Sequence, residues 1–260
     1  MSRLFDGVDD QTLGTITAIA DSDWTMACWV YPLSAGEGSN GRLMSTYISG
    51  DTAAQVFRMG GVTLPLRAVQ LHATTNATSV SVETLATSAW SLAIATYRAS
   101  DNTMRIFIGT LSAAVVECTY STQTAGVGTF TTGGVNIRLG CRSSTDETFD
   151  GRIGPSVFDN REWTIPEMER FRSGLFPAPR STVKAFYPLM SPTAAQAEDL
   201  SASGAHLTVT GATVAEDPPV AFRWGDAIPV AIGPTAAGAA VLPERHFPRG
   251  VARGLIRGAA

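Results

Sequence analysis

The sequence predicts an all-β sandwich or barrel, and three observations lead to that prediction. Strand-like runs separated by Gly, Ser, Asn and Asp recur through most of the first 215 residues, at the short spacing typical of such folds. Helical periodicity is nearly absent from the same stretch. The composition is that of a globular protein, with 44% hydrophobic and 16% charged residues among 260, so a sizeable core can form.

The clearest strands lie in the first half of the chain. Residues 25–31 are apolar on both alternating faces, which predicts a central strand covered on each side, and Pro32 ends it. Residues 90–97 and 104–108 flank a turn-forming Ser-Asp-Asn-Thr run and are predicted to form a β-hairpin. Further strands are predicted at residues 55–59, 68–73, 79–83, 114–120, 135–141, 151–159 and 183–189.

One short helix is predicted over residues 164–172. Thr164 is a suitable N-cap, Glu167 completes a capping box with it, and Gly174 suits the C-terminal stop. Three apolar side chains spaced three or four residues apart are expected to pack this helix onto the sheets: Met168, Phe171 and Leu175.

The character of the chain changes near residue 223. From there Pro, Gly and Ala dominate, and four prolines prevent a long regular element. We therefore divide the chain into a β domain over residues 1–222, with a terminal strand region at 182–222, and an arm over residues 223–260. The arm carries evenly spaced arginines that could enter acidic grooves or accompany an added strand on a neighbour. An arm that is simply solvated is an equally favoured alternative. The arginines are Arg245, Arg249, Arg253 and Arg257.

Charge and cysteine content narrow the classes of function. A formal net charge of -4 argues against a nucleic-acid partner for the domain. No apolar run approaches the roughly 20 residues that span a bilayer, and no secretory signal pattern follows Met1, so no membrane association is expected. The three cysteines, Cys28, Cys118 and Cys141, are odd in number and lack zinc-site spacing, so buried free thiols are expected.

Several segments, in order along the chain, resemble one family. They are residues 4–10 (Leu-Phe-Asp-Gly-Val-Asp-Asp), residues 24–32, residues 104–109, residues 149–154 (Phe-Asp-Gly-Arg-Ile-Gly), and residues 157–161 with the helix that follows. Together they resemble the laminin G-like jelly rolls of the concanavalin A-like superfamily over about residues 4 to 176. One departure is Ile108, which stands where the family usually has Asp before Gly. The resemblance implies a jelly roll of two antiparallel sheets.

A second resemblance lies nearer the C-terminus. Residues 186–189, 199–201, 206–213 and 218–220 are similar to the continuation of such domains in tailed-bacteriophage virion proteins. This likeness implies a structural protein of the virion, assembled in the host cytoplasm, as a capsid decoration protein or an accessory head or tail component. Its partners would be the major capsid protein or its own copies in a homo-oligomer. The alternative is a lectin-like adhesion module that binds a cell-surface glycan.

No catalytic constellation is found, so we predict that the protein is not an enzyme. Glycoside hydrolysis requires two carboxylates flanking the sugar bond, and the Glu-x-Asp-x-x-Glu strand of the family's glucanases does not occur. The nearest acidic cluster, residues 146–150, does not put a matching pair on one strand face. The three histidines have no motif around them: His72, His206 and His246.

Calcium is the one cofactor that remains open, because related jelly rolls often bind it through loop oxygens. The oxygen donors that could converge if the terminal strands pair are Asp6, Asp9, Asp10, Asp146 and Asp150. Ordinary turn and strand-end roles are the favoured alternative.

Glycan contact would require exposed aromatic rings on loops at one end of the sandwich. By elimination the candidates are Tyr47, Trp163 and Trp224, whereas Trp24, Trp29 and Trp90 lie in strand-like runs and are predicted to be core residues.

Overall fold

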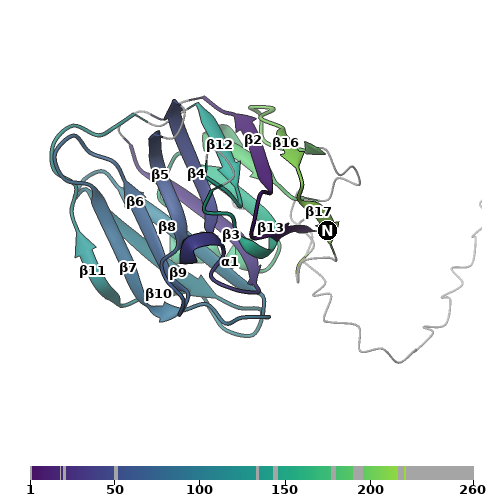
Figure 1. The fold of residues 1–260 in the computed structure, drawn as a ribbon. Helices are drawn as coiled ribbons and strands as arrows, with labels where there is room; N and C mark the ends of the chain where they lie inside the picture. The colour runs from purple at the N-terminus through teal and green to yellow at the C-terminus, as the bar shows by residue number, and fades with distance from the viewer. Residues whose placement is uncertain are drawn as a thin grey trace, which may run out of the picture.

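The computed structural model describes residues 2–17, 19, 22–49, 52–132, 135–142, 146–176, 180–189, 196–215 and 220. Within these residues, two antiparallel β-sheets lie face to face (Figure 1). This is the sandwich that the sequence predicts. The boundary at residue 222, the arm and its four arginines lie outside the described residues.

The first sheet has eight strands in the order β10-β9-β8-β3-β13-β1-β17, with β14 also paired to β13. β1 pairs with the first half of β13 and β14 with the second half, so they follow each other along one side of that strand. In chain order the strands are β1 (Ser2–Asp6), β3 (Trp24–Pro32), β8 (Ser91–Arg98), β9 (Thr103–Gly109), β10 (Val116–Glu117), β13 (Asp150–Asp159), β14 (Val183–Tyr187) and β17 (Thr213–Ala215).

The second sheet has nine strands in the order β11-β7-β6-β5-β4-β12-β2-β16-β15. Strands that follow the predicted helix join both sheets, because β16 pairs with β2 whereas β17 pairs with β1. In chain order the strands are β2 (Gln11–Thr15), β4 (Arg42–Ser49), β5 (Thr52–Met59), β6 (Pro65–Gln70), β7 (Ala77–Thr84), β11 (Tyr120–Thr124), β12 (Asn136–Leu139), β15 (Gln196–Ala197) and β16 (Leu207–Thr210).

The space between the sheets is filled by the main hydrophobic core. Trp24 stacks on Tyr97 at 6.1 Å between ring centroids, and both side chains are fully buried. Polar groups in this core are hydrogen-bonded to each other, as burial requires. The indole Nε1 of Trp24 and the amide of Gln55 both donate to Gln70 Oε1, each at 2.9 Å. This network joins the two sheets across the core.

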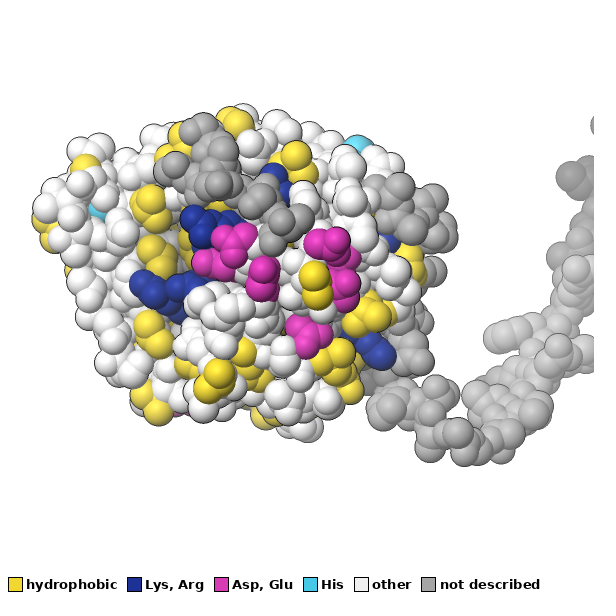
Figure 2. Space-filling view, in the orientation of Figure 1, with side chains coloured by type: hydrophobic (Ala, Val, Ile, Leu, Met, Phe, Trp, Pro, Cys, Tyr) yellow, Lys and Arg dark blue, Asp and Glu magenta, His cyan; other side chains and the backbone are white. Residues whose placement is uncertain are grey.

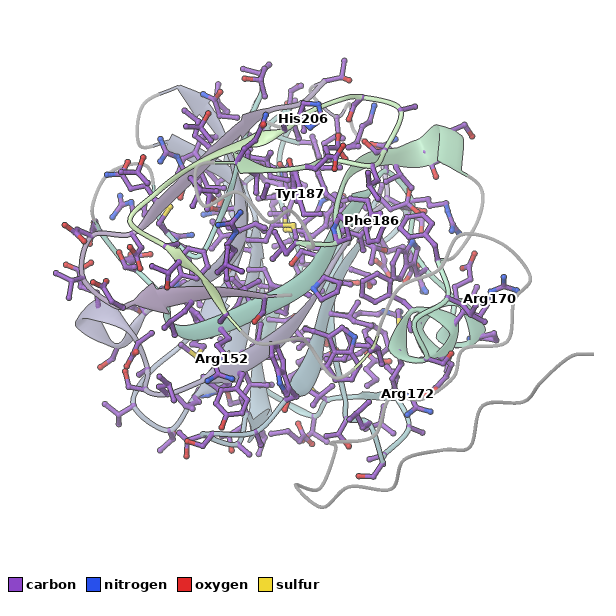
Figure 3. All side chains as sticks on the ribbon, turned by 90° about the vertical axis from the view of Figure 1, so that its right-hand side faces the viewer. Arg152, Arg170, Arg172, Phe186, Tyr187 and His206 are labelled. Carbon is purple, nitrogen blue, oxygen red and sulfur yellow. The ribbon has the colours of Figure 1, made fainter. Side chains whose placement is uncertain are left out.

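A second layer covers the outer face of the eight-stranded sheet. Helix α1 (Ile165–Arg172) begins with the predicted capping box, in which the Thr164 backbone N–H donates to Glu167 at 2.8 Å. Met168 and Phe171 of α1 pack with Trp29 of β3 in a separate buried cluster. Figure 3 shows α1, with Arg170 and Arg172, outside the sandwich, and Phe186 between the helix and the central Tyr187.

Most predicted strands are confirmed with shifted ends, and the hairpin is the β8–β9 pair. The single strand predicted over residues 114–120 is wrong. Val116 and Glu117 pair with β9 in one sheet, and the chain then crosses to pair Tyr120–Thr124 with β7 in the other. A continuous polar-apolar pattern cannot reveal such a change of hydrogen-bonding partner.

Two other expectations can be compared with the structure. The three cysteines are buried free thiols, as predicted. Trp90 precedes β8, is half-buried and packs against the buried cluster that contains Trp29, so its predicted place in the core is confirmed only in part. Among the described residues, no helix has the length and apolar character to cross a membrane.

Candidate functional site

Two of the aromatic residues predicted to contact a glycan are buried. Tyr47 is 1% exposed, accepts a hydrogen bond from the Ser45 hydroxyl at 3.0 Å and lies 5.9 Å from the guanidinium carbon of Arg138. Trp163 is 2% exposed. The prediction is therefore wrong for both rings, because neither ring can present a face to a sugar. Trp224, the third candidate, lies outside the described residues.

Trp163 is held in place by the layer that contains α1. Its indole Nε1 donates to the buried carboxylate of Asp159 at 2.7 Å, and its ring lies 5.4 Å from that of Phe171. A shallow groove of about 220 Å³ runs past its edge. Arg98 and Glu162, which line this groove, bind each other through two hydrogen bonds of 2.8 and 2.9 Å. Trp163 therefore has a structural role.

A different pair of aromatic rings is partly exposed on the outer face of the eight-stranded sheet. Side chains of β3 alternate, so Tyr31 lies on the same face as Trp29. Trp29 is buried in the cluster with α1, whereas Tyr31 lies near the end of the strand and is only half-buried. The Tyr31 and Trp90 rings are 5.5 Å apart with an interplanar angle of 59°.

Arg152 completes this group. It is the cross-strand partner of Tyr31, and its guanidinium carbon lies 5.2 Å from the centre of the Tyr31 ring. The register continues from Arg152 to Leu4 of β1. Figure 3 places Arg152 well away from α1. We call Tyr31, Trp90 and Arg152 the aromatic platform.

The aromatic platform combines the groups that sugar recognition uses. Aromatic rings offer apolar faces, while a guanidinium offers directed donors for hydroxyl oxygens. The sequence prediction missed Tyr31 because residues 25–31 were expected to be covered on both faces along their whole length. The sequence did carry a signal. Tyr31 stands next to Pro32 at the end of the strand, and a single helix of eight residues is too short to cover the whole length of the sheet face.

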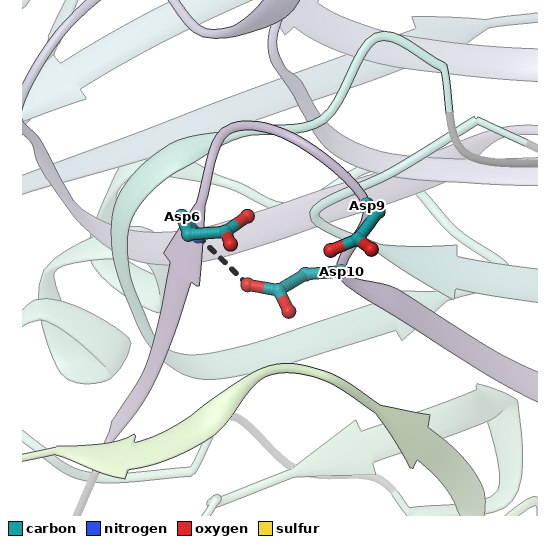
Figure 4. Close-up of side chains that lie close together, drawn as sticks. All are labelled: Asp6, Asp9 and Asp10. Atoms are coloured by element: carbon teal, nitrogen blue, oxygen red, sulfur yellow. Dashed lines mark hydrogen bonds between the residues drawn. The ribbon is translucent and has the colours of Figure 1, made fainter.

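Three of the five acidic residues considered for calcium lie together in the turn between β1 and β2 (Figure 4). Carboxylate oxygens of Asp6, Asp9 and Asp10 lie within 4.8 Å of one another. The Asp6 backbone N–H donates to Asp10 at 2.7 Å. Burial raises the pKa of Asp10, and repulsion from Asp6 and Asp9 raises it further.

This donor set fits a hard divalent cation, which would be bound by oxygen and would offset the repulsion among the carboxylates. Asp150 faces Asp6 across the β1–β13 pair but is not part of the group of three. Asp146 is engaged by Arg142 at 3.1 Å. The predicted convergence of five acids is therefore wrong for these two: Asp146 is held by an ion pair, and Asp150, although it is the cross-strand partner of Asp6, does not bring its carboxylate into the group of three.

Residues 5–162 match the family model described as the Concanavalin A-like lectin/glucanases superfamily. This match covers more than half of the chain and includes most of the segments that carried the first resemblance, whereas the helix at Ile165–Arg172 lies beyond it. No curated protein matches the chain.

Solved structures resemble the fold at low sequence identity. A candidate carbohydrate-binding protein from Bacteroides ovatus aligns with a TM-score of 0.57 and 14% identity over 83% of this chain, which spans 62% of that protein. A SAP-like pentraxin from Limulus polyphemus aligns at 0.52 with 12% identity, over 80% and 93% of the two chains. Tailspike protein 2 of an Escherichia coli O157:H7 bacteriophage aligns at 0.46 with 9% identity, over 72% and 30%. The first two likenesses show the fold alone.

Proposed function

The chain belongs to the Concanavalin A-like lectin/glucanases superfamily, and from that premise we propose that it is a non-catalytic glycan-binding module. The family holds both lectins and glucanases by description, so the fold does not decide between them. The observation that carries the proposal is the aromatic platform, because two adjacent aromatic rings are left partly uncovered beside a guanidinium.

Sugar would bind by laying an apolar ring face on Trp90 or Tyr31, with hydroxyls near Arg152. Aromatic side chains contribute large contact areas at low entropic cost, which suits shallow recognition on a sheet face. A module of this kind binds weakly through one copy and gains strength through several copies. The relative from Bacteroides ovatus is consistent with this proposal, although its likeness supports the fold only.

We favour binding over hydrolysis because two carboxylates in residues 146–150 form ion pairs with arginines. Glu147 binds Arg42 at 2.5 Å and Asp146 binds Arg142 at 3.1 Å. Ion pairs of this kind hold carboxylates in fixed positions away from a shared substrate, whereas a glycosidase needs two carboxyl groups across one sugar bond.

The proposal is tested by substitution of the platform. A glycan array identifies the best oligosaccharide for the wild-type chain, and isothermal titration calorimetry then compares variants. Trp90→Ala and Tyr31→Ala are expected to weaken binding at least tenfold, about 1.4 kcal/mol. Leu111→Ala is the matched control, because Leu111 is 42% exposed and lies outside the platform. Absence of any glycan ligand, or equal affinity for Trp90→Ala and wild type, would contradict the proposal.

A role in a phage virion is the second candidate, and it is supported by the resemblance of residues 186–220 to virion proteins. The two roles are compatible, since a glycan-binding module can sit on an adsorption apparatus. Deleting residues 224–260 separates them: particle incorporation is expected to fail if the arm attaches the protein, while glycan binding survives. If the truncated chain still joins particles, the arm is not the attachment device.

A further inference from the structure

The outer face of the nine-stranded sheet carries three arginines in one row. Arg42 of β4 is the cross-strand partner of Arg58 of β5, and Arg58 is the partner of Arg67 of β6. The neighbours of Arg58 and Arg67 along their strands point into the core, so alternation directs both arginines outward. Figure 2 shows basic side chains on this face of the molecule, with acidic side chains beside them. We call Arg42, Arg58 and Arg67 the arginine row.

Only part of the positive charge around the row is paired with acidic side chains. Arg42 binds Glu147 at 2.5 Å, and Arg142 lies 3.7 Å from the same carboxylate and 3.1 Å from Asp146. Among the described residues, neither Arg58 nor Arg67 forms an ion pair, and Arg58 instead donates to the side-chain oxygen of Asn40. Arg42 and Arg142 therefore share Glu147, whereas Arg58 and Arg67 have no acidic partner among the described residues.

Nitrogen atoms in the row lack protein acceptors. Within the described part of the chain, Arg42 Nη1 and Arg67 Nε are buried and have no hydrogen-bond partner. The Arg42 side chain is only 8% exposed. A buried donor without an acceptor costs about 1–3 kcal/mol, more when it is charged, so a small change in the position of these side chains that brings the donors to an acceptor is favourable.

The charges around Arg58 also favour a bound anion. Burial lowers the pKa of Arg58, Glu147 raises it, and the charges of Arg42, Arg67 and Arg142 lower it again. Repulsion among the arginines is therefore present around Arg58. An anion placed over the row would reduce that repulsion and accept hydrogen bonds in the planar geometry that guanidinium groups favour.

We propose that the arginine row is an anion-binding site that takes the carboxylate or sulfate groups of an acidic polysaccharide. Three neighbouring strands place the row across about 10 Å of the sheet, from two strand spacings, which suits a chain of repeated charges better than one small ion. The site lies on the sheet opposite to the one that carries the aromatic platform. The choice of a polysaccharide rests on the proposed glycan-binding function, whereas the anion site rests on the arginines.

The test compares charged and neutral polymers of the same backbone. Dextran sulfate, polygalacturonate and unsulfated dextran are titrated into the full chain at low and physiological salt, with inorganic sulfate as a separate titration. We expect binding of the two acidic polymers and not of dextran, weakening as salt rises. Binding of inorganic sulfate without binding of either acidic polymer would overturn the polysaccharide assignment.

Variants locate the site. Arg58→Gln and Arg67→Gln are expected to weaken binding of the acidic polymers at least tenfold, and Arg67→Lys less, because it keeps the charge but loses the planar donors. Arg105→Gln is the matched control, since Arg105 lies on β9 of the other sheet and is paired with Asp101 at 3.8 Å. An equal loss in Arg105→Gln would show general electrostatic attraction and overturn the proposal.

A further comparison separates this inference from the proposed function. Trp90→Ala is expected to leave the affinity for dextran sulfate unchanged. If the row variants lose polyanion binding while the glycan array yields no ligand that depends on Trp90, the anion site stands and the proposed function of the platform fails. Thermal unfolding of each variant confirms that it is folded.

Discussion

The outer faces of the two sheets differ although their strands alternate in the same way. On the eight-stranded sheet, Trp29, Leu92 and Ile94 are buried beneath α1 and its flanking segments. On the nine-stranded sheet, Val82 is 57% exposed on β7, next to a strand that carries the arginine row, and Leu13 is 39% exposed on β2. An outward-facing side chain therefore stabilises the fold where a further layer such as α1 covers the sheet, and it stays accessible to solvent where no such layer covers it. The aromatic platform lies at the margin of the covered face.

The largest expected effect comes from removing a side chain beneath the helix. Trp29→Ala is expected to lower the free energy of unfolding by about 3–5 kcal/mol, because it leaves a cavity between β3 and α1. Val82→Ala on the other sheet is the matched substitution and is expected to change it by less than about 0.5 kcal/mol. Urea denaturation followed by circular dichroism measures both. Similar losses for the two variants would contradict the difference between the faces.

The start of α1 is expected to contribute less. Thr164→Ala removes the N-cap side chain and is expected to cost about 1 kcal/mol of unfolding free energy. The helix should remain folded on the sheet, since Met168 and Phe171 are still buried. Ser112→Ala, in an exposed loop, serves as the control substitution. A loss as large as that of Trp29→Ala would mean that the cap, rather than packing, holds the covering layer.

The smallest effect is expected in the acidic turn, where the sign depends on pH and on calcium. The folded-state pKa of Asp10 is raised, so its contribution to stability is present below the unfolded pKa and is lost as pH rises through the folded value. Without divalent cations, Asp10→Asn should therefore gain stability relative to wild type as pH rises from acid to neutral. Chemical denaturation between pH 3 and pH 7 with a chelator measures this difference.

If the three carboxylates bind calcium, wild type should become more stable than Asp10→Asn at neutral pH when calcium is added, because a ligand of the folded state stabilises that state. Wild type would then gain thermal stability on adding calcium, and Asp10→Asn would gain less. If calcium changes neither protein, the turn is not a calcium site. If wild type gains stability relative to Asp10→Asn with rising pH under chelator, the pKa direction is wrong.

Features with local causes could be predicted from the sequence. The capping box at Thr164 and Glu167 and the hairpin between β8 and β9 depend on residues close together in the chain. The central position of β3 followed from its apolar faces, and it pairs with β8 on one side and β13 on the other. These predictions did not depend on knowing which distant segments of the chain pack against each other.

The candidate sites could not be predicted from the sequence, because they depend on packing between segments that are far apart in the chain. The sequence predicts exposed rings for Tyr47 and Trp163, yet both are buried by contacts that strand periodicity does not show. The sequence predicts a covered strand for Tyr31 and a core position for Trp90, yet both are only half-buried, with Trp90 at the edge of the buried cluster around α1. The arginine row appears only once β4, β5 and β6 are in register.

The most direct test of glycan binding by the platform is the NMR signal of the Trp90 indole N–H. Spectra of the wild-type chain are recorded with increasing amounts of the array-selected oligosaccharide, and Trp90→Phe assigns the signal. The account predicts that the Trp90 signal shifts while those of buried Trp24, Trp29 and Trp163 stay in place. A bound oligosaccharide that leaves the Trp90 signal unmoved would contradict it.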